Sequence, residues 1–229
     1  MNTRLSALLV AATFLLTACA SAPQLPLPVA PQAFAAPSNN YGVVLTKLPV
    51  VDTQFPGAGC LLCIAAASVA NSSLTAHAKT LPAEDLAVLN KQVADVLRKK
   101  GVKVTMIDDL DLSKLPDASN KVPNFARKDF TSLKAKYKID KLLVINIGMI
   151  GIERTYAAYI PNGEPKAKIA GDTYIVNLND NSLEWSMPIN AVKASDGKWD
   201  EPPKFPGLTN AYYQVLEMAK DSVLTPLAQ

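Results

Sequence analysis

An apolar run from residue 142 to residue 152, LLVINIGMIGI, constrains the fold of this chain more than any other feature. Asn146 is its one polar side chain. A strand that is half exposed alternates apolar and polar residues, whereas a strand buried on both faces is almost continuously apolar. The run therefore predicts a strand at the centre of a sheet.

Two further strands are predicted after this central one. Residues 168–178 and 183–192 carry spaced apolar and aromatic side chains, among them Tyr174 and Trp185. The four residues between these segments, NDNS, favour a compact turn because Asn, Asp and Ser bond to nearby backbone groups. We expect the three strands to form an antiparallel meander.

The first half of the chain predicts two strands separated by a helix. β-Branched residues indicate a strand at 41–51 that ends near Pro49, and residues 102–107 indicate a short second strand. Between them, Thr80-Leu81-Pro82 favours a helix start, because threonine can cap first-turn amides and proline is tolerated there. Gly101 favours the end of that helix.

Two more helices complete the expected fold, one capped by Asn124 and the last beginning near Leu208 or Thr209. The apolar block 61–70 is too short to span a membrane, and we expect it to start a buried helix or to pack as a loop on the core. The predicted fold class is α/β (α+β). It is a single mixed sheet of about five strands with about three helices, in the order β-α-β-α-β-β-β-α.

Residues 1–18 have the parts of a secretory signal peptide: a positive charge at Arg4, an apolar run and small residues. The end of this segment, Leu16-Thr17-Ala18-Cys19, resembles the lipobox of bacterial lipoproteins. That resemblance implies a diacylglycerol on the Cys19 thiol, cleavage before Cys19, and acylation of the new amino terminus with palmitate or a similar chain. The alternative is an ordinary secretory signal cut near Ala18-Cys19-Ala20.

The residues that follow Cys19 bear on location and reach. Ala20 and Ser21 stand where lipoproteins retained in the inner membrane of enteric-type bacteria usually carry Asp, so the resemblance implies the periplasmic face of the outer membrane. The proline-rich stretch 19–40 predicts a tether that stays extended and does not pack. Residues 41–229 are then expected to form one periplasmic domain.

Charge and composition argue against several classes of function. The chain has 23 basic and 20 acidic residues and no basic block, which argues against nucleic-acid binding. A single histidine, His77, gives no basis for a Ser-His-Asp site. Asp108, Asp109 and Asp111 lack the glycine and glutamate of a calcium loop, so a solvated turn is favoured over a cation site. We therefore expect no catalytic residues, no metal and no cofactor, and we do not expect an enzyme.

Cys60-Leu61-Leu62-Cys63 is the remaining candidate for chemistry. Such a pair can be a redox site at a helix amino terminus, or half of a zinc site, although no second cysteine pair is present. In an oxidising periplasm a structural disulfide or two buried thiols is favoured. Four aromatic residues could form a recognition surface, although such residues more often fill the core: Trp185, Trp199, Tyr212 and Tyr213.

Two segments carry a resemblance to known periplasmic domains: residues 136–145, KYKIDKLLVI, and residues 176–185, VNLNDNSLEW. They resemble the helix ending "Y-x-x-D" and the hairpin "V-D-L-x-T-G-x-x-W" of the α/β domains found in amino-terminal TolB, in curli-secretion lipoproteins and in outer-membrane lipoproteins that activate penicillin-binding proteins. Asn177 and Ser182 depart from that pattern. The resemblance implies a shared fold class and a non-catalytic role in the cell envelope.

We therefore expect an outer-membrane-anchored periplasmic lipoprotein that acts as a non-catalytic interaction or assembly module. Its expected partners are the membrane, through the lipid, and an envelope protein or further copies of itself. One alternative is a thiol-disulfide redox protein that uses Cys60 and Cys63. Another is an oligomeric, secretion-channel-like lipoprotein whose segment 59–70 inserts into the membrane, which is less favoured because a membrane hairpin alternates over about ten residues per strand.

Overall fold

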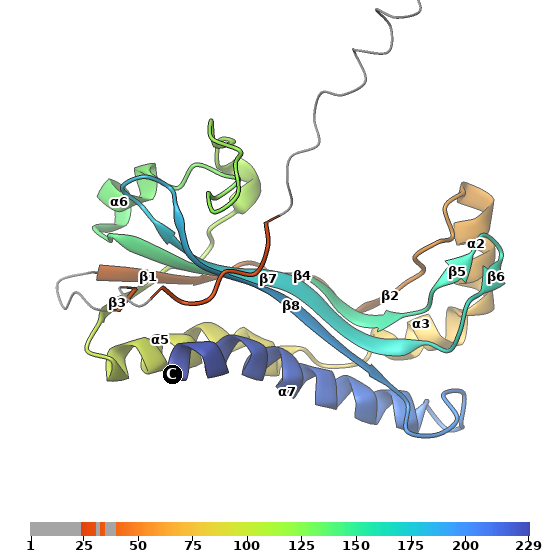
Figure 1. Cartoon of the computed structure of the whole chain (residues 1–229). Coiled ribbons are helices and arrows are strands. Elements are labelled where there is room, and N and C mark those ends of the chain that lie inside the picture. The colour runs from red at the N-terminus through yellow and green to blue at the C-terminus, as the bar shows by residue number, and fades with distance from the viewer. Residues whose placement is uncertain (1–23, 31–32, 35–39) are drawn as a thin grey trace, which may run out of the picture.

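The computed structural model describes residues 24–30, 33–34 and 40–229 of the chain. The predicted signal peptide and Cys19 lie outside the described residues, so both assignments stay predictions. Figure 1 shows a curved sheet with two helices along one face and a lobe on part of the other. The predicted fold class, a mixed α/β fold on a main mixed sheet, is confirmed.

The main sheet is built around β4 (Lys141–Glu153), the strand predicted to be central. β1 (Asn40–Leu45) pairs with it in parallel on one side, and β7 (Lys166–Asn177) pairs antiparallel on the other. β3 (Lys103–Met106) lies outside β1 and β8 (Leu183–Ala194) lies outside β7, which gives the order β3-β1-β4-β7-β8. The predicted antiparallel meander of β4, β7 and β8 is confirmed.

Short strands that the sequence pattern did not predict extend this sheet at one end. β2 (Asp52–Gln54) pairs in parallel with the last residues of β4. β5 (Tyr156–Ala157) and β6 (Ile160–Pro161) form a separate two-stranded hairpin directly after β4. The strand predicted at 41–51 ends earlier, at Leu45.

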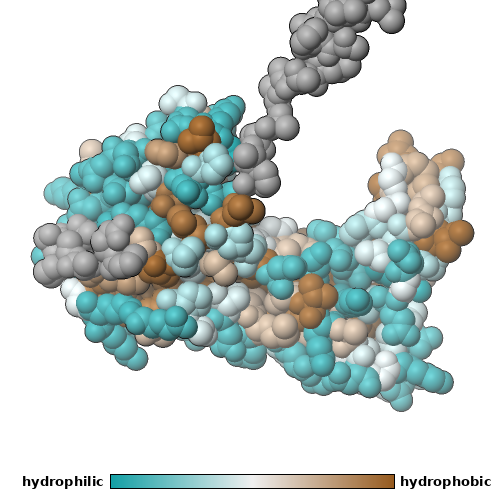
Figure 2. Space-filling model, in the orientation of Figure 1, coloured by the Kyte–Doolittle hydropathy of each residue, from teal (hydrophilic) through white to brown (hydrophobic). Residues whose placement is uncertain are grey.

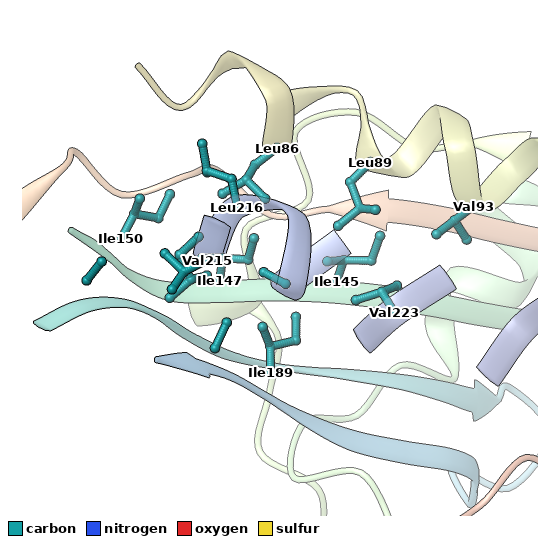
Figure 3. Close-up of a cluster of buried hydrophobic side chains, with 14 of the residues drawn as sticks. Leu86, Leu89, Val93, Ile145, Ile147, Ile150, Ile189, Val215, Leu216 and Val223 are labelled. Atoms are coloured by element: carbon teal, nitrogen blue, oxygen red, sulfur yellow. The ribbon is translucent and has the colours of Figure 1, made fainter. Parts of the chain in front are cut away.

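Two helices, α5 (Leu89–Lys99) and α7 (Pro206–Ala228), cover one face of the sheet and bury the larger hydrophobic cluster. Their apolar residues recur at helical spacing, so each helix presents one apolar stripe to the strands. Figure 3 shows side chains that meet there: Leu89 and Val93 on α5, Val215 and Val223 on α7, and Ile145 and Ile147 on β4.

A smaller lobe covers part of the opposite face, where Phe130 and Leu133 pack against Val144 of β4. The prediction that its helix starts at Asn124 is wrong, because α6 spans Ser132–Tyr137. Asn124 has a φ of +66°, in the left-handed region, and its carbonyl accepts a hydrogen bond from the N–H of Leu183 at 2.8 Å. The backbone at Asn124 is therefore used to pair with the start of β8.

The helix predicted to start at Thr80 begins later and is divided. α3 (Ser72–Ala78) comes first, and the Thr80 hydroxyl donates to the His77 carbonyl at 2.7 Å, so this threonine closes α3. α4 (Glu84–Ala87) and α5 then follow, separated at Val88.

The amino-terminal segment packs on the domain, which corrects the prediction of an unpacked tether for residues 24–30 and 33–34. Leu27 exchanges two backbone hydrogen bonds with Ser186 of β8, at 2.7 and 3.0 Å, and the N–H of Ala30 donates to the Glu184 carbonyl at 3.0 Å. β8 is an edge strand, and its free backbone groups can bind an extended segment whatever its composition. The remainder of 19–40, apart from Asn40 in β1, lies outside the described residues.

A buried polar cluster fixes the end of this segment. Ala33 is fully buried, and its carbonyl accepts hydrogen bonds from the Lys141 ammonium group at 3.0 Å and from the Tyr41 hydroxyl. Lys141 also pairs with Glu184 at 2.6 Å, so both charges are compensated inside the protein. Residues 24–30 and 33–34 therefore belong to the folded domain, which was predicted to start at residue 41.

Candidate functional site

The apolar block 61–70 forms a helix, but that helix is not buried as expected. α2 (Leu61–Ala70) buries only Cys63 and Ala67, which lie one turn apart on one face. Its large side chains, including Leu61 and Leu62, point away from the protein. The burial pattern is thus the reverse of a core helix, because the small residues pack inward and the large apolar residues face outward.

A second segment lies against α2 and adds to its exposed surface. Tyr159 lies in the turn of the β5–β6 hairpin and is 55% exposed, and Ile160 is the first residue of β6 and is 70% exposed. We call the exposed large apolar residues of the two segments the apolar tip: Leu61 (87% exposed), Leu62 (72%), Ile64 (47%), Val69 (76%), Tyr159 and Ile160. Figure 2 shows brown, apolar surface at the raised end of the molecule where these elements lie.

The segments that form the apolar tip carry no charged side chain. No Asp, Glu, Lys or Arg occurs between Asp52 and Lys79, or between Arg154 and Glu164. Exposed apolar residues occur singly on most soluble proteins, whereas a contiguous apolar patch marks a contact surface. Both segments that make the tip therefore have the composition of a contact surface.

A buried hydrogen-bond network fixes the tip on the sheet. The Asn71 side-chain amide donates to the Tyr156 hydroxyl at 2.6 Å and to the Ala67 carbonyl at 2.7 Å, and its oxygen accepts from the Arg154 guanidinium at 2.9 Å. Asn71 is 2% exposed and stands between α2 and α3, so one side chain joins the helices, the hairpin and the end of β4.

The backbone of the two segments also meets closely. The N–H of Tyr156 donates to the Pro56 carbonyl at 2.7 Å, and a Cβ at Gly57 would lie 1.9 Å from the Tyr156 carbonyl oxygen. Gly57 also has a φ of +87°, which residues with a side chain rarely adopt. This position requires glycine, and the hairpin and α2 are held as one unit.

Cys60 and Cys63 are joined by a disulfide at the amino terminus of α2. The N–H of Cys63 donates to the Cys60 sulfur at 2.9 Å, and the Tyr159 hydroxyl lies 3.6 Å from the same sulfur. Cys63 is buried and Cys60 is exposed. The pair therefore lies within the apolar tip, beside Tyr159 and Leu61, and is exposed to solvent on the Cys60 side.

His77 lies apart from the cysteine pair. Its Nε2 is 2.7 Å from the Thr209 hydroxyl oxygen, and its ring packs against Phe205 with a centroid distance of 5.5 Å. Partial burial, and secondarily the charge of Lys204, lower the pKa of His77 below its ordinary value. These surroundings favour the neutral imidazole, and the ring links α3 to the start of α7.

The acidic residues 108, 109 and 111 lie in a loop before the short helical turn at Leu112–Lys114. The Asp111 carboxylate accepts hydrogen bonds from the N–H and hydroxyl of Ser113, at 3.0 and 2.6 Å, and these bonds lower its pKa. Across the described ranges 24–30, 33–34 and 40–229, no group of three His, Cys, Asp or Glu side chains could hold a metal ion.

The four aromatic candidates divide between core and surface. Trp185 and Tyr212 are fully buried, as the core interpretation predicted. Trp199 is half-buried, stacks on Phe205 and accepts the Arg154 guanidinium over its ring at 4.9 Å. Tyr213 is exposed, and the four residues do not form one recognition surface.

The sequence interpretation missed the β5–β6 half of the tip. Its signal is the uncharged stretch 155–163, TYAAYIPNG, in which Pro-Asn-Gly favours a turn after exposed apolar residues. It also missed a row of three polar side chains, on the residue after β1, on β4 and on β7: the Thr46 hydroxyl donates to Asn146 at 3.0 Å, and the Asn146 amide donates to the Asp172 carboxylate at 2.9 Å. Burial raises the pKa of Asp172, and the bond from Asn146 opposes that effect.

A cavity of about 280 Å³ adjoins Asp172 on the face opposite α5 and α7. Residues 24–26 form one wall, residues 125–128 form another, and Tyr174 of β7 lies at its floor. Asp172 is the one acidic residue among its lining positions, and Arg127 and Lys128 are the basic ones.

Within the described part of the chain, no single helix is long and apolar enough to cross a membrane. α2 and α3 reach that length and composition only when taken together, and a bend of 75° separates them.

No protein-family model matches this chain, and no curated protein matches it in sequence. Among solved structures, the chain is similar to the PelC dodecamer from Paraburkholderia phytofirmans, with 9% identity, coverage of 90% of this chain and 93% of that chain, and a TM-score of 0.36. It is also similar to lipoprotein GNA1162 from Neisseria meningitidis, with 11% identity, coverage of 83% and 98%, and a TM-score of 0.35.

A third similar structure is a homolog of the neuraminyllactose-binding hemagglutinin from Helicobacter pylori, with 12% identity, coverage of 92% and 87%, and a TM-score of 0.39. At these TM-scores the three similarities support no conclusion about the role of this chain.

Proposed function

We propose that this chain is a lipid-anchored protein on the periplasmic face of the bacterial outer membrane, where it acts as a non-catalytic interaction or assembly module. The lipobox resemblance at Cys19 supports the anchor. The folded domain supplies a contact surface, and we assign that role to the apolar tip.

The observation that carries the proposal is the reversed burial of α2. Leu61, Leu62 and Val69 are each more than two-thirds exposed, while the inner face of the helix is filled by Cys63 and Ala67. Core stability does not require these large side chains, because they contribute little buried area. An uncharged apolar surface that is held rigidly and not used by the fold is suited to contact with another envelope component.

Photo-crosslinking in intact cells tests this proposal. A benzophenone amino acid replaces Leu62 in one variant of the full chain, and it replaces Val50, an 81% exposed residue outside the tip, in the control variant. After illumination, the membrane-bound chain is purified and its adducts are identified by mass spectrometry.

We expect adducts with an envelope component from position 62 and only background from position 50. Equal yields of adducts from the two positions would contradict the proposal. Recovery of the chain from the soluble periplasm without a lipid would also contradict it.

A thiol-disulfide function is the second candidate, and one observation favours it. Cys60 is exposed at the amino terminus of α2 and accepts the N–H of Cys63, a position that stabilises a thiolate after reduction. The apolar setting weighs against it, because Leu61, Leu62 and Ile64 lie beside the pair and the segment 53–78 carries no Asp, Glu, Lys or Arg.

The reduction potential of the Cys60–Cys63 pair separates the two functions. A structural disulfide has a potential below about −300 mV, whereas thiol-disulfide enzymes lie near −270 mV or higher. A high potential together with insulin reduction by the reduced protein would favour the enzyme and remove the non-catalytic proposal.

A further inference from the structure

The apolar tip and the amino-terminal entry of the chain lie on the same side of the sheet. Figure 1 shows α2, β5 and β6 rising from one end of the sheet, on the side opposite α5 and α7. Gln24 lies on that side as well: its side chain bonds to Asn124 of the lobe, and it lines the cavity that has Tyr174 as its floor.

The chain between the predicted lipid and the folded domain is short. Gln24 is the fifth residue after Cys19, and a fully extended chain of that length reaches about 17 Å. Residues 24–30 are bound to β8, so they do not add to this reach. A lipidated Cys19 therefore holds the face that carries Gln24 within about 17 Å of the bilayer surface.

The dimensions of the tip fit the outer part of a bilayer. α2 has ten residues and is about 15 Å long, half of the roughly 30 Å of the hydrocarbon core. Four apolar residues project from α2, and Tyr159 adds an aromatic ring with a hydroxyl, the kind of side chain enriched where lipid meets water. Exposed Leu25, beside Gln24, adds an apolar side chain near the anchor.

The chemistry of the tip suits lipid better than a protein partner. Protein interfaces carry a polar rim and about one hydrogen bond per 100–200 Å², which fix the register of the two surfaces. The segments 53–78 and 155–163 have no charged residue to set a register, and the tip is a projection, not a groove. An apolar surface can enter a bilayer without being aligned to one position on it and without a polar rim that matches a partner.

We propose that the apolar tip inserts into the interfacial region of the membrane that holds the lipid anchor, so that the domain has two attachment points and a fixed orientation. The inference rests on the proposed anchor at Cys19 and deepens it by naming the lipid bilayer as the component that the tip contacts. In this orientation α5 and α7 face away from the membrane.

Fluorescence quenching by brominated lipids tests the contact. The full chain is expressed with its own signal segment, purified in detergent from membranes, and reconstituted into vesicles of phosphatidylethanolamine and phosphatidylglycerol with bromine on the upper acyl chain. Ile160→Trp places an indole at the tip, and Val50→Trp is the control at an exposed residue outside it. Trp185 and Trp199 are present in both variants, so the fluorescence of the unsubstituted chain is measured and subtracted.

We expect brominated lipid to quench roughly half of the added fluorescence at position 160 and almost none at position 50, since an interfacial side chain lies within reach of the bromines. Leu62→Trp repeats the measurement on α2 in case the hairpin does not tolerate tryptophan. Equal quenching at the tip and control positions would overturn the inference.

Flotation of the same vesicles separates the two proposals. Variants that float with the vesicles but show no differential quenching would overturn the lipid contact and leave the anchor intact. Chains that do not float would overturn both the anchor and the inference that rests on it. If the tip shows no quenching and the benzophenone variant at position 62 gives a crosslinked dimer, the tip is a contact between copies of the chain.

Discussion

At the scale of single residues, Asn71 is the side chain that organises the candidate site. Its amide and oxygen join Tyr156, Ala67 and Arg154, and it is almost fully buried. A buried polar group is costly when it lacks a partner, so this network favours one arrangement of α2 and the hairpin over alternatives.

Asn71→Ala is expected to loosen the tip. Removing the amide leaves the buried Tyr156 hydroxyl without this donor and the Arg154 guanidinium without this acceptor, which costs about 1–3 kcal/mol. Chemical denaturation measures the loss, and hydrogen exchange should rise first in residues 155–163. Asn210→Ala, at an exposed position of α7, is the matched control and should change stability by less than about 0.5 kcal/mol. Equal effects of the two substitutions would contradict this role of Asn71.

Asp172 is expected to make stability depend on pH in a definite direction. Its folded pKa lies above the ordinary value of 3.8, so the folded state binds the proton more tightly than the unfolded state. This contribution to stability is present below pH 3.8 and is lost as the pH rises through the folded pKa. The variant Asp172→Asn has no carboxyl group to titrate, so its stability does not decrease in this way. The amide oxygen of the new side chain can still accept the hydrogen bond from Asn146.

Urea midpoints measured from acid to neutral pH check the prediction for Asp172. The midpoint of the unchanged chain should fall relative to that of Asp172→Asn as the pH rises. Parallel curves for the two proteins would contradict it.

At the scale of elements, long periodic segments were predictable and short or exposed ones were not. The central strand β4, its partners β7 and β8, and the buried stripe of α7 were predicted, because each repeats an apolar pattern over ten or more residues. β2 has three residues and β5 and β6 have two each, which is too short for any period to show.

The prediction for α2 failed for a different physical reason. An apolar segment indicates a preference for leaving water, and it does not say whether the protein core or another surface receives it. In α2 the core receives Cys63 and Ala67, and the leucines remain outside. The helix could therefore be predicted from its composition, whereas its orientation and its use as a candidate site depended on the β5–β6 hairpin.

A pair of substitutions in α2 tests this reversed orientation. Leu62→Ser is expected to change the free energy of unfolding by less than about 0.5 kcal/mol, because the side chain is 72% exposed. Ala67→Leu is expected to cost about 1–3 kcal/mol, because its added methyl groups must fit against Tyr156 in a filled cluster. Denaturant unfolding of the two variants provides the measurement, and a larger loss from Leu62→Ser would show that the helix faces the other way.

At the scale of the whole molecule, the amino-terminal segment changes what the predicted anchor does. A free tether over 19–40 would let the domain range far from the membrane, but residues 24–30 are bound along the edge of β8. A lipid at Cys19 would therefore hold the domain close to the membrane. The apolar tip and Gln24 lie on one side of the sheet and the α5–α7 layer lies on the other. The anchor indicated by residues 16–19 stays a prediction. The sequence did not indicate that an uncharged proline-rich segment would pair with an edge strand.

The anchor at Cys19 is the premise of this arrangement, and the mass of the mature amino-terminal peptide tests it most directly. For the chain isolated from the outer-membrane fraction, we predict a peptide that begins at Cys19 and carries a thioether-linked diacylglycerol and an amide-linked acyl chain. Cys19→Ala should accumulate as an uncleaved precursor without lipid. A mature peptide that begins at Ala20, or that begins at Cys19 with an unmodified thiol, would contradict the account.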